Sequence, residues 1–482
     1  MSTTSSWRKS AGYIWAMLGS AVGFANLLSF SAHCYRGGGG AFLLPYFAAM
    51  FIVGVPMLLL EAAIGQHFRS ALVPACARVK SSPAAFWGWL SVLSCLTIGA
   101  FYVVLTGYSV LYFVEAALGH IQDDTASFFR NEVLHLTPSI SEMGSLVPGL
   151  FLSTLAVLFI TYRVNRQPIS RGVEKACSYF MPLLGALAIV GAVAVSFLPG
   201  ACSGIMRLFY PQMDVLANSA LWRDVFGQLF FSYSLGLGIV VGYSAHAGHQ
   251  INLFRAMSWV ALGDFAISLL SAIIIFGFIG AVSTAQGVSF ESWMSTDSTF
   301  EIGFVVYPKL LQTFAPHWGR FLQMLLFFCL FVAGITGVFS IVESICGNFQ
   351  WRFGLNRAKT TLVACLLLLV GATFFCFGFG PHLIDALAPQ VLGINMLLGA
   401  CALIWIFTSR FHVLGPHPLF KSGILRRYLL AIVLPWALLS LGMSLYHEWA
   451  SSFDVAKGVR AYWVCVSIVL ALALSKNPQE KI

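Results

Sequence analysis

The sequence predicts an all-α membrane protein with about 12 transmembrane helices. The chain has 482 residues, of which 59% are hydrophobic and 9% are charged, and its mean hydropathy is +0.84. A soluble protein carries roughly 25% charged residues, so this composition excludes a soluble enzyme, a disordered regulator and a fibrous protein. Apolar blocks of the length that a bilayer requires, about 20 residues, recur along the whole chain.

We predict the spans in chain order as apolar blocks bounded by charged or turn-forming residues. Their approximate bounds are 11–33, 40–66, 85–118, 145–162, 178–198, 222–244, 258–284, 319–348, 361–378, 383–409, 428–448 and 459–475. The last block is short. An even number of spans places both termini on one side of the membrane.

The basic residues predict the orientation. In this segmentation 19 of the 27 lysines and arginines lie on the side of the termini, which the positive-inside rule assigns to the cytoplasm. They are scattered between apolar blocks, so we expect no nucleic-acid partner. The chain contains no Asn-x-Ser/Thr sequon, and we therefore predict a multi-pass protein of a bacterial inner (plasma) membrane with cytoplasmic termini.

Two spans carry glycine and polar residues at mid-membrane depth. The first contains Gly19–Asn26 (Gly-Ser-Ala-Val-Gly-Phe-Ala-Asn), and the sixth contains Phe231–Gly238 (Phe-Ser-Tyr-Ser-Leu-Gly-Leu-Gly). Interrupted helices are tolerated in a bilayer only where the freed backbone faces protein or a cavity, and matched interruptions in two halves of a chain indicate a transporter binding site. A helix-packing face is the alternative for Gly19-x-x-x-Gly23, and the matched break in the sixth span makes it the weaker one.

Three further stretches stand in order and at regular spacing around these breaks: Gly38–Tyr46, Val53–Glu61 and Ala333–Thr336. Together with the two breaks, they resemble the signature motifs of the neurotransmitter:sodium symporters of the bacterial leucine-transporter type. The similarity runs from about Trp7 to Trp405 and is looser beyond that point.

The resemblance implies the leucine-transporter fold, an inverted repeat of five plus five spans with discontinuous helices 1 and 6. The corresponding divisions are 1–200 for the first repeat, 201–410 for the second and 411–482 for two additional spans. It also implies sodium-driven uptake of a small amino acid or amine by alternating access, with two Na+ ions and no organic cofactor. Unwound helices suit this function because they offer free carbonyls to a hard cation and free N–H groups to a carboxylate.

The resemblance assigns residues to three sites. The first sodium site would use the Ala21 carbonyl, the Asn26 amide oxygen, Ser232, Asp264 and the substrate carboxylate. The second would use the carbonyls of Gly19, Val22 and Ala333 and the Thr336 hydroxyl. Tyr102 would hold the substrate carboxylate, and the full substrate-binding set is Ala21, Phe24, Ala25, Ile98, Tyr102, Phe231, Ser232, Ser234, Leu237, Gly337 and Ile341.

Position 23 bears on the substrate. Family members that carry monoamines have an aspartate here, whereas this chain has Gly23, so the resemblance favours an amino acid that brings its own carboxylate. Gly337 and Leu237 stand where the family often has a hydroxyl residue and a phenylalanine. We expect both replacements to widen the pocket, and we predict a neutral, large apolar or aromatic amino acid as the substrate.

Asp264 stands where the family usually has asparagine. It adds a negative charge at mid-membrane, which is costly without a cation. Four residues near it in the family register resemble a chloride site: Tyr46, Gln228, Ser232 and Ser268. We predict that Asp264 replaces chloride and that transport is chloride-independent. Two alternatives stay open, namely a protonated Asp264 that donates a hydrogen bond and proton release in each cycle.

The gate positions depart from the family pattern. Ser29 stands in place of the outer arginine, although its acidic partner is retained as Asp385. The outer ion pair is therefore absent or rebuilt with another cation. Glu61 is a carboxylate within the second span, which we assign to the support of backbone freed by the breaks.

The inner gate departs as well. Trp351 falls near the position of the family's gate aspartate, so Arg8 and Lys9 need another acidic partner, for which Glu343 is our candidate. His246 and His249 have HxxH spacing without a third ligand near them in the sequence, and we predict no metal other than sodium.

We predict no enzyme, because the spans contain no Ser/His/Asp grouping, HExxH motif or aspartate pair. A substrate-binding sensor or a channel-like protein on the same scaffold is the alternative function, and the altered gates give it some support. The expected partners are an amino acid and the lipid bilayer, and the sequence leaves open whether the protein is a monomer or a homodimer.

Overall fold

The computed structural model describes residues 7–80, 82–121, 124–293, 302–314, 318–409, 414, 417–450 and 452–476. These residues are mostly helical. Their β-structure consists of two isolated bridges, Gly39–Pro211 and Leu146–Phe377. The predicted all-α class is therefore confirmed.

Within the described part of the chain, ten helical segments are long and apolar enough to cross a membrane. They are α3 (Gly40–Ala49) continuing into α4 (Val55–Phe68), α6 (Ser82–Leu118), α8 (Pro148–Asn165), α9 (Val173–Ser196), α13 (Leu253–Gln286), α16 (Gly319–Phe353), α17 (Arg357–Phe375), α18 (Gly380–Ala388) continuing into α19 (Met396–Thr408), α21 (Ile424–Tyr428) continuing into α22 (Leu434–Ala450), and α23 (Val455–Ser475). The paired segments are joined by the π-helical turns Met50–Gly54, Pro389–Asn395 and Leu429–Val433.

Two further spans are broken, as predicted. The first consists of α1 (Ser10–Ala21) and the segment Ala25–Arg36, which ends in α2 (Phe30–Arg36); the two halves are bent by 60°. The sixth consists of α11 (Ser219–Ser232) and α12 (Ile239–Ser244), separated by a short irregular segment. Together with the ten continuous segments, they account for the twelve predicted spans.

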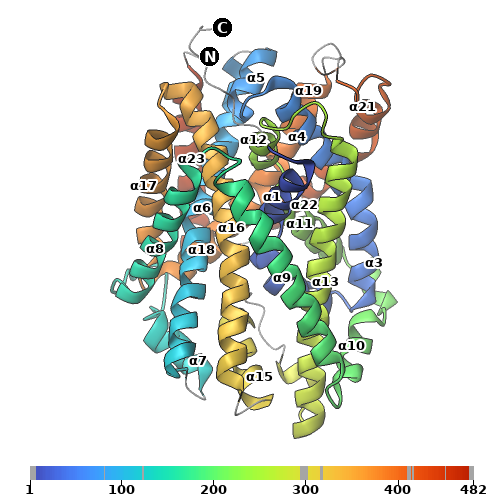
Figure 1. The fold of residues 1–482 in the computed structure, drawn as a ribbon, viewed down its shortest axis with the longest axis vertical. Coiled ribbons are helices and arrows are strands. Elements are labelled where there is room, and N and C mark those ends of the chain that lie inside the picture. Colours follow the sequence, from blue (N-terminus) through green and yellow to red (C-terminus); the bar gives the residue numbers. More distant parts are fainter. Residues whose placement is uncertain are drawn as a thin grey trace.

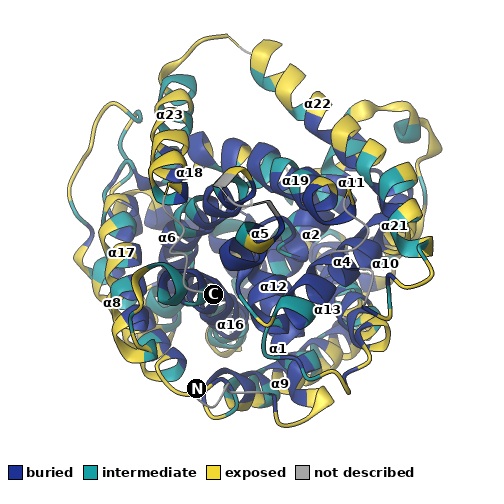
Figure 2. Ribbon diagram, turned by 90° about the horizontal axis from the view of Figure 1, so that it is seen from above, coloured by how far each residue is buried: buried dark blue, intermediate teal, exposed yellow. Residues whose placement is uncertain are grey.

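The long helices run side by side, and short helices lie at both ends of the molecule (Figure 1). One end holds α5 (Leu72–Lys80), and the other holds α7 (Thr125–Ser127), α10 (Ala201–Phe209) and α15 (Tyr307–Phe314). Seen along the helices, α2 and α12 lie in the buried centre, whereas α8, α17, α22 and α23 lie at the rim (Figure 2). The broken helices therefore occupy the interior of the bundle.

Large apolar side chains are exposed around this rim, where a water-soluble protein would place polar ones. Five of them, each more than 60% exposed, are Leu152 and Phe159 on α8, Val190 on α9, Val370 on α17 and Val469 on α23. Such a belt of exposed apolar side chains is stable in contact with lipid acyl chains. The helices also satisfy their own backbone hydrogen bonds, as a bilayer requires.

Glycines bring α6 and α16 into close contact. An added Cβ at Gly99 would lie 2.8 Å from Ile341, one at Gly334 would lie 2.6 Å from Thr106, and one at Gly337 would lie 2.8 Å from Tyr102. Small residues allow this approach in the membrane interior, where packing rather than water exclusion holds helices together. This helix pair forms a continuous wall beside the broken spans.

The two breaks have local causes. After α1, Val22 is extended (φ −74°, ψ 116°), and the Gly23 N–H is donated to the Asn26 side chain at 2.8 Å instead of continuing the helix. After α11, the backbone is left-handed at Ser234, Gly236 and Gly238 (φ 51°, 77° and 76°). Glycine adopts this conformation without strain, while other residues rarely do.

Both ends of the described chain lie on one side of the molecule. Trp7 Nε1 donates to the Tyr243 carbonyl at 3.0 Å near the end of α12. The Lys476 carbonyl accepts from Arg352, near the end of α16, at 3.4 Å. His246, which follows α12, lies 3.5 Å from Glu343 of α16. Figure 1 marks both termini at the same end of the molecule.

We predict that Gly236→Ala strongly destabilises the protein. The residue has φ 77°, and an added Cβ would overlap the Met396 carbonyl oxygen, so both backbone strain and a steric clash oppose the substitution. We expect a loss of about 2 kcal/mol or more, seen as a lower midpoint in detergent thermal unfolding. Gly227→Ala in α11 is the control, because nothing lies within 4 Å of its Cβ position. Equal midpoints for the two variants would contradict the prediction.

Candidate binding site between the broken helices

The two breaks face each other. Gln228 Nε2 on α11 donates to the Ala25 carbonyl at 3.0 Å, and Ser234 Oγ donates to the Ser20 carbonyl at 3.3 Å. The backbone freed in one span is thus partly satisfied by side chains of the other. This mutual support places the two unwound segments side by side.

Glu61 on α4 supports the second break. Its Oε1 atom accepts the Gly236 N–H at 2.7 Å, and the whole side chain is buried. A buried N–H without a partner costs about 1–3 kcal/mol, so this carboxylate replaces a hydrogen bond that the helix would otherwise provide. The supporting role assigned to Glu61 from the sequence matches this geometry.

Several backbone carbonyls of the first break remain available. Among the described residues, the carbonyls of Gly19, Ala21 and Val22 accept no hydrogen bond, because α1 ends at Ala21 and Gly23 donates to Asn26. Buried carbonyl groups are nearly always paired in native proteins. An unpaired group at this depth can therefore bind a ligand that prefers oxygen.

The side chains predicted for the first sodium site form one buried cluster. Asn26 Nδ2 lies 3.0 Å from Ser232 Oγ and 2.7 Å from Asp264 Oδ1. Ser232 Oγ lies 2.9 and 3.0 Å from the two Asp264 oxygens. None of the ion pairs among the described residues involves Asp264, so its carboxylate is paired only with neutral groups.

The Asn26 amide is oriented differently from the expectation. Its oxygen, which was predicted as a sodium ligand, accepts the Gly23 N–H, and its nitrogen faces Asp264. Coordination of a cation by the amide oxygen therefore requires the amide to rotate or the oxygen to be shared with Gly23. The residue stands at the predicted place, and its role as a ligand stays a prediction.

The residues that resemble a chloride site lie in or next to the same cluster. Ser268 Oγ accepts from Asn26 at 2.8 Å and donates to the Asp264 carbonyl at 2.9 Å. The Tyr46 ring stacks on Phe265 with centroids 6.1 Å apart. Its buried hydroxyl has no hydrogen-bond partner among the described residues. The Asp264 carboxyl therefore lies beside residues of the predicted anion site, and its role in place of chloride stays a prediction.

The residues predicted for the second sodium site also converge. Thr336 Oγ1 donates to the carbonyls of Val332 and Ala333, both at 3.1 Å. A Cβ at Gly19 would lie 3.2 Å from the Thr336 Cβ atom, and Val22 belongs to the same buried cluster as Ala333. Gly19 therefore packs against Thr336, and Val22 and Ala333 belong to one apolar cluster, so the residues predicted for this site are neighbours in the structure.

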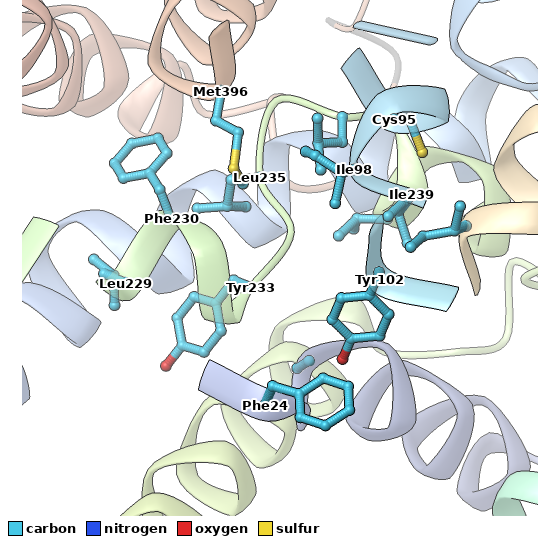
Figure 3. Close-up of a cluster of buried hydrophobic side chains, with 14 of the residues drawn as sticks. Phe24, Cys95, Ile98, Tyr102, Leu229, Phe230, Tyr233, Leu235, Ile239 and Met396 are labelled. Atoms are coloured by element: carbon cyan, nitrogen blue, oxygen red, sulfur yellow. The ribbon is translucent and has the colours of Figure 1, made fainter. Parts of the chain in front are cut away.

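A small cavity of about 30 Å³ lies between the breaks and the α6–α16 wall. Nine predicted substrate residues line it: Ala21, Ala25, Ile98, Tyr102, Phe231, Ser234, Leu237, Gly337 and Ile341. The other two predicted residues are Phe24, whose ring packs edge-on against Tyr102 with centroids 5.2 Å apart, and Ser232, which faces Asp264. Figure 3 shows the Tyr102 hydroxyl pointing toward Phe24, with Ile98 and Ile239 beyond the other side of the ring.

Four lining residues lie outside the predicted substrate-binding set: Ser20, Gly23, Ile239 and Ser340. Ser340 could have been found from helical periodicity, because it follows Thr336 by four residues and lies on the same helix face. Ile239 begins the helix after the second break, and its inward position depends on the path of the irregular segment. No local signal indicates that path.

The expectation that Gly337 widens the pocket is wrong. The space that a side chain would occupy is filled by Tyr102, whose Cε1 and hydroxyl oxygen lie 2.8 and 2.9 Å from the position of an added Cβ. A Cβ at Gly23 would also overlap the Tyr102 hydroxyl. Both glycines therefore make room for the tyrosine rather than for a larger substrate.

The predicted outer-gate residues Ser29 and Asp385 line one cavity of about 560 Å³. His33, Arg223 and His447 contribute basic groups to its lining, and Asp224 and Glu448 contribute acidic ones. His33 Nδ1 lies 3.5 Å from Asp224, and Asp224 also pairs with Arg223 at 3.4 Å. Basic groups are therefore present beside acidic ones in this cavity, although position 29 holds no arginine.

The expected pairing of Glu343 with Arg8 or Lys9 is wrong. Arg357 binds both Glu343 oxygens, at 2.9 and 2.6 Å, and His246 lies 3.5 Å away on the other side. The Arg8 backbone N–H is instead donated to Glu174 at 3.0 Å. Arg357 takes this place because it begins α17 next to the buried Glu343 carboxylate. Its planar guanidinium can form two parallel hydrogen bonds with the two carboxylate oxygens.

This arrangement of groups suits a hard cation beside a zwitterion. The oxygens of a carboxylate, hydroxyls and free carbonyls are the ligands that hard cations prefer, and the Tyr102 hydroxyl lies against the backbone of Gly23 and Phe24. The Asp264 carboxyl is buried beside these groups, and an ionised carboxylate at this depth would favour a cation as its partner.

A family model described as the sodium:neurotransmitter symporter family matches residues 4–122 and 114–411. The chain belongs to this family. As a member of the sodium:neurotransmitter symporter family, it is a sodium-dependent, multi-pass membrane transporter, and the family consists of transporters rather than enzymes.

Individual relatives agree with this assignment. A sodium-dependent transporter of Methanocaldococcus jannaschii is 31% identical over 438 residues, which cover 89% of this chain and 88% of that protein. The sodium-dependent neutral amino acid transporter SLC6A17 of Homo sapiens is 27% identical over 303 residues, 57% of this chain and 40% of that protein. The crystal structure of MhsT in complex with L-phenylalanine is 21% identical, with a TM-score of 0.74 over 98% of this chain and 99% of that chain, and it shares the fold.

We predict that Asn26→Ala lowers sodium-dependent uptake at least about ten-fold. The substitution removes the group that joins Ser232 and Asp264 and that ends α1 through Gly23, at roughly 1 kcal/mol for each hydrogen bond. Uptake into proteoliposomes at graded sodium concentrations measures the effect. Asn395→Ala is the control, because Asn395 is also buried and donates to a serine, Ser94, at 2.9 Å. Unaltered sodium dependence in Asn26→Ala would contradict its assigned role.

Proposed function

We propose that the protein imports a neutral, large apolar or aromatic amino acid together with two Na+ ions by alternating access. The main observation that supports this proposal is that two broken helices meet at the buried cluster of Asn26, Ser232 and Asp264, next to a cavity lined by Tyr102. Sodium is a co-substrate here, and its gradient supplies the driving force.

Two sets of oxygens support the two ions. The first set contains the Ala21 carbonyl, Asn26, Ser232 and Asp264, and the second contains the carbonyls of Gly19, Val22 and Ala333 with the Thr336 hydroxyl. Because Ala21 belongs to the first set and also lines the cavity, a substrate carboxylate bound there lies next to the first ion. Each ligand then stabilises the binding of the other, which is the basis of coupling.

The cavity favours an amino acid over an amine. Its described lining contains no acidic or basic side chain, so a substrate amine lacks a carboxylate partner, whereas a zwitterion carries its own. The Tyr102 hydroxyl and the backbone near Gly23 and Phe24 can bind the substrate carboxylate. Relatives include sodium-dependent neutral amino acid transporters, and the crystal structure of MhsT is a complex with L-phenylalanine.

The size of the substrate follows from the side-chain wall. Ile98, Leu237, Ile239 and Ile341 are all buried and line the cavity. Burying an apolar side chain of comparable size against them is worth about 1.5–3 kcal/mol, which a small substrate such as glycine cannot gain. A larger side chain requires the 30 Å³ cavity to open.

The two sides of the protein differ in a way that fits alternating access. On the side of Ser29 and Asp385 lies the cavity of about 560 Å³. On the side of the termini, Trp7 packs on Tyr243, and Glu343 contacts both Arg357 and His246. The position of 19 of the 27 basic residues on that side supports cytoplasmic termini in a bacterial inner membrane, and we propose a monomer or homodimer there.

Radiolabelled uptake into proteoliposomes under an inward sodium gradient tests the function. We expect leucine and phenylalanine to accumulate and to be outcompeted best by large apolar or aromatic members of the twenty amino acids. Binding without accumulation would instead support a sensor, the alternative to which the altered gates give some support. Stronger competition by glycine than by leucine and tryptophan would overturn the size argument.

We further propose that transport is chloride-independent because Asp264 supplies the negative charge. We predict equal uptake by the wild-type protein in chloride and gluconate buffers. Asp264→Asn removes the charge while Tyr46, Gln228 and Ser268 remain, so we expect uptake to fall at least about ten-fold in gluconate and to recover in part in chloride.

Asp454→Asn is the matched control, because Asp454 caps α23 through the Lys457 N–H at 2.7 Å and lies outside the cluster. Strict chloride dependence of the wild-type protein would refute the replacement of chloride by Asp264. An Asp264→Asn variant as active in gluconate as the wild type would refute it equally.

A further inference from the structure

Ser340 is a buried hydroxyl residue of the cavity that has no role in the function described so far. Its side chain is 1% exposed, and it lines the same cavity as Ala21 and Tyr102. It lies on α16, three residues after Gly337 and four after Thr336. A polar side chain at this depth is costly unless its hydrogen bonds are satisfied.

Contacts between α6 and α16 place Ser340 away from the charged end of the substrate. Gly337 lies against Tyr102, and one helical turn further on Ile341 lies against Gly99. Ser340 therefore lies at the level of Ile98, about one helical turn from the Tyr102 ring in the direction of the side that holds the chain termini. The other polar lining groups, Ser20, Ser234 and Tyr102, lie at the breaks, where Ser234 donates to the Ser20 carbonyl.

The Ser340 hydroxyl can act only as an acceptor toward a substrate. It donates its single hydrogen to the Gly337 carbonyl at 2.7 Å. A serine hydroxyl has one hydrogen and two lone pairs, so the lone pairs remain for a ligand. A phenol O–H or an indole N–H can donate to them, whereas a phenyl ring or an aliphatic chain cannot.

Ser340 lies on the wall that is least able to move. The cavity of about 30 Å³ is too small for an aromatic ring, so one wall must move when a large substrate binds. α16 is a continuous helix of 35 residues, whereas Tyr233–Gly238 is irregular and contains Ser234, Gly236 and Gly238 in left-handed conformations. The irregular segment with Leu237 is therefore the wall that yields, and Ser340 remains as a fixed point.

We propose that Ser340 makes the transporter selective for amino acids whose large side chain ends in a hydrogen-bond donor, such as tyrosine and tryptophan. This proposal rests on the proposed function and specifies its substrate class. A net hydrogen bond of about 1 kcal/mol corresponds to a preference of roughly five-fold for tyrosine over phenylalanine. The preference for tyrosine is modest because the Ser340 hydroxyl keeps its hydrogen bond to the Gly337 carbonyl when phenylalanine binds. Phenylalanine therefore does not leave it without a partner.

Competition of sodium-driven leucine uptake by tyrosine and by phenylalanine tests the proposal, since the two competitors differ by one hydroxyl. We expect tyrosine to compete about five-fold better with the wild-type protein and equally well with Ser340→Ala. Ser344→Ala is the control, because Ser344 is one turn further along α16, is equally buried and does not line the cavity. It should retain the preference.

Equal competition by tyrosine and phenylalanine in the wild type would overturn the proposal, as would a preference that persists in Ser340→Ala. Leucine uptake separates these outcomes from a failure of the proposed function, because a protein that accumulates no amino acid refutes transport itself. If Ser340→Ala abolishes all uptake, Ser340→Cys decides. Its thiol is similar in size and a weak acceptor, and it should lose the preference while it still carries leucine.

Discussion

The structure depends on one constraint: a peptide group released from a helix inside a bilayer must find another partner. Two spans release such groups, and the protein satisfies them selectively. Asn26 accepts the Gly23 N–H, Gln228 binds the Ala25 carbonyl and Glu61 binds the Gly236 N–H. The carbonyls of Gly19, Ala21 and Val22 are left for ligands, because water is excluded at this depth. The same bonds that stabilise the breaks thus decide which oxygens can bind cations.

The buried carboxylates of Glu343 and Asp264 differ in whether a basic side chain pairs with them. Glu343 is held by Arg357 with two hydrogen bonds and has His246 at 3.5 Å, so its charge is compensated within the protein. Asp264 is also buried, but among the described residues its carboxylate is hydrogen-bonded to the neutral side chains of Asn26 and Ser232. The ion pair of Glu343 with Arg357 suits a contact that closes one side of the protein. Within the described part of the chain the Asp264 carboxylate has no basic partner, which suits the reversible binding of a cation. The difference in pairing separates a structural carboxylate from one that can take part in ion coupling.

Tyr102 connects the substrate cavity with the packing of the scaffold. It fills the space at both Gly23 and Gly337, so one ring touches the first break and the continuous helix α16. A change at either glycine therefore displaces the group proposed to bind the substrate carboxylate. The pocket is therefore shaped by this interlocking contact, because the space beside both glycines is already filled by the tyrosine.

The sequence alone determined the class, the number of spans and the position of both breaks. These features depend on bilayer thickness and on residues that are neighbours in the chain, such as Gly19 and Asn26 in one span or Ser234 and Gly238 in another. The grouping of Asn26 with Ser232 and Asp264 was also predictable, although only through the family resemblance, since these residues lie more than 200 positions apart or on different helices. Only the tertiary structure decided that Tyr102 fills the space beside Gly337, that Arg357 holds Glu343, how the Asn26 amide is turned and that Ser340 faces the cavity. Each of these depends on side-chain contacts between distant segments, whose distances and directions no local pattern encodes.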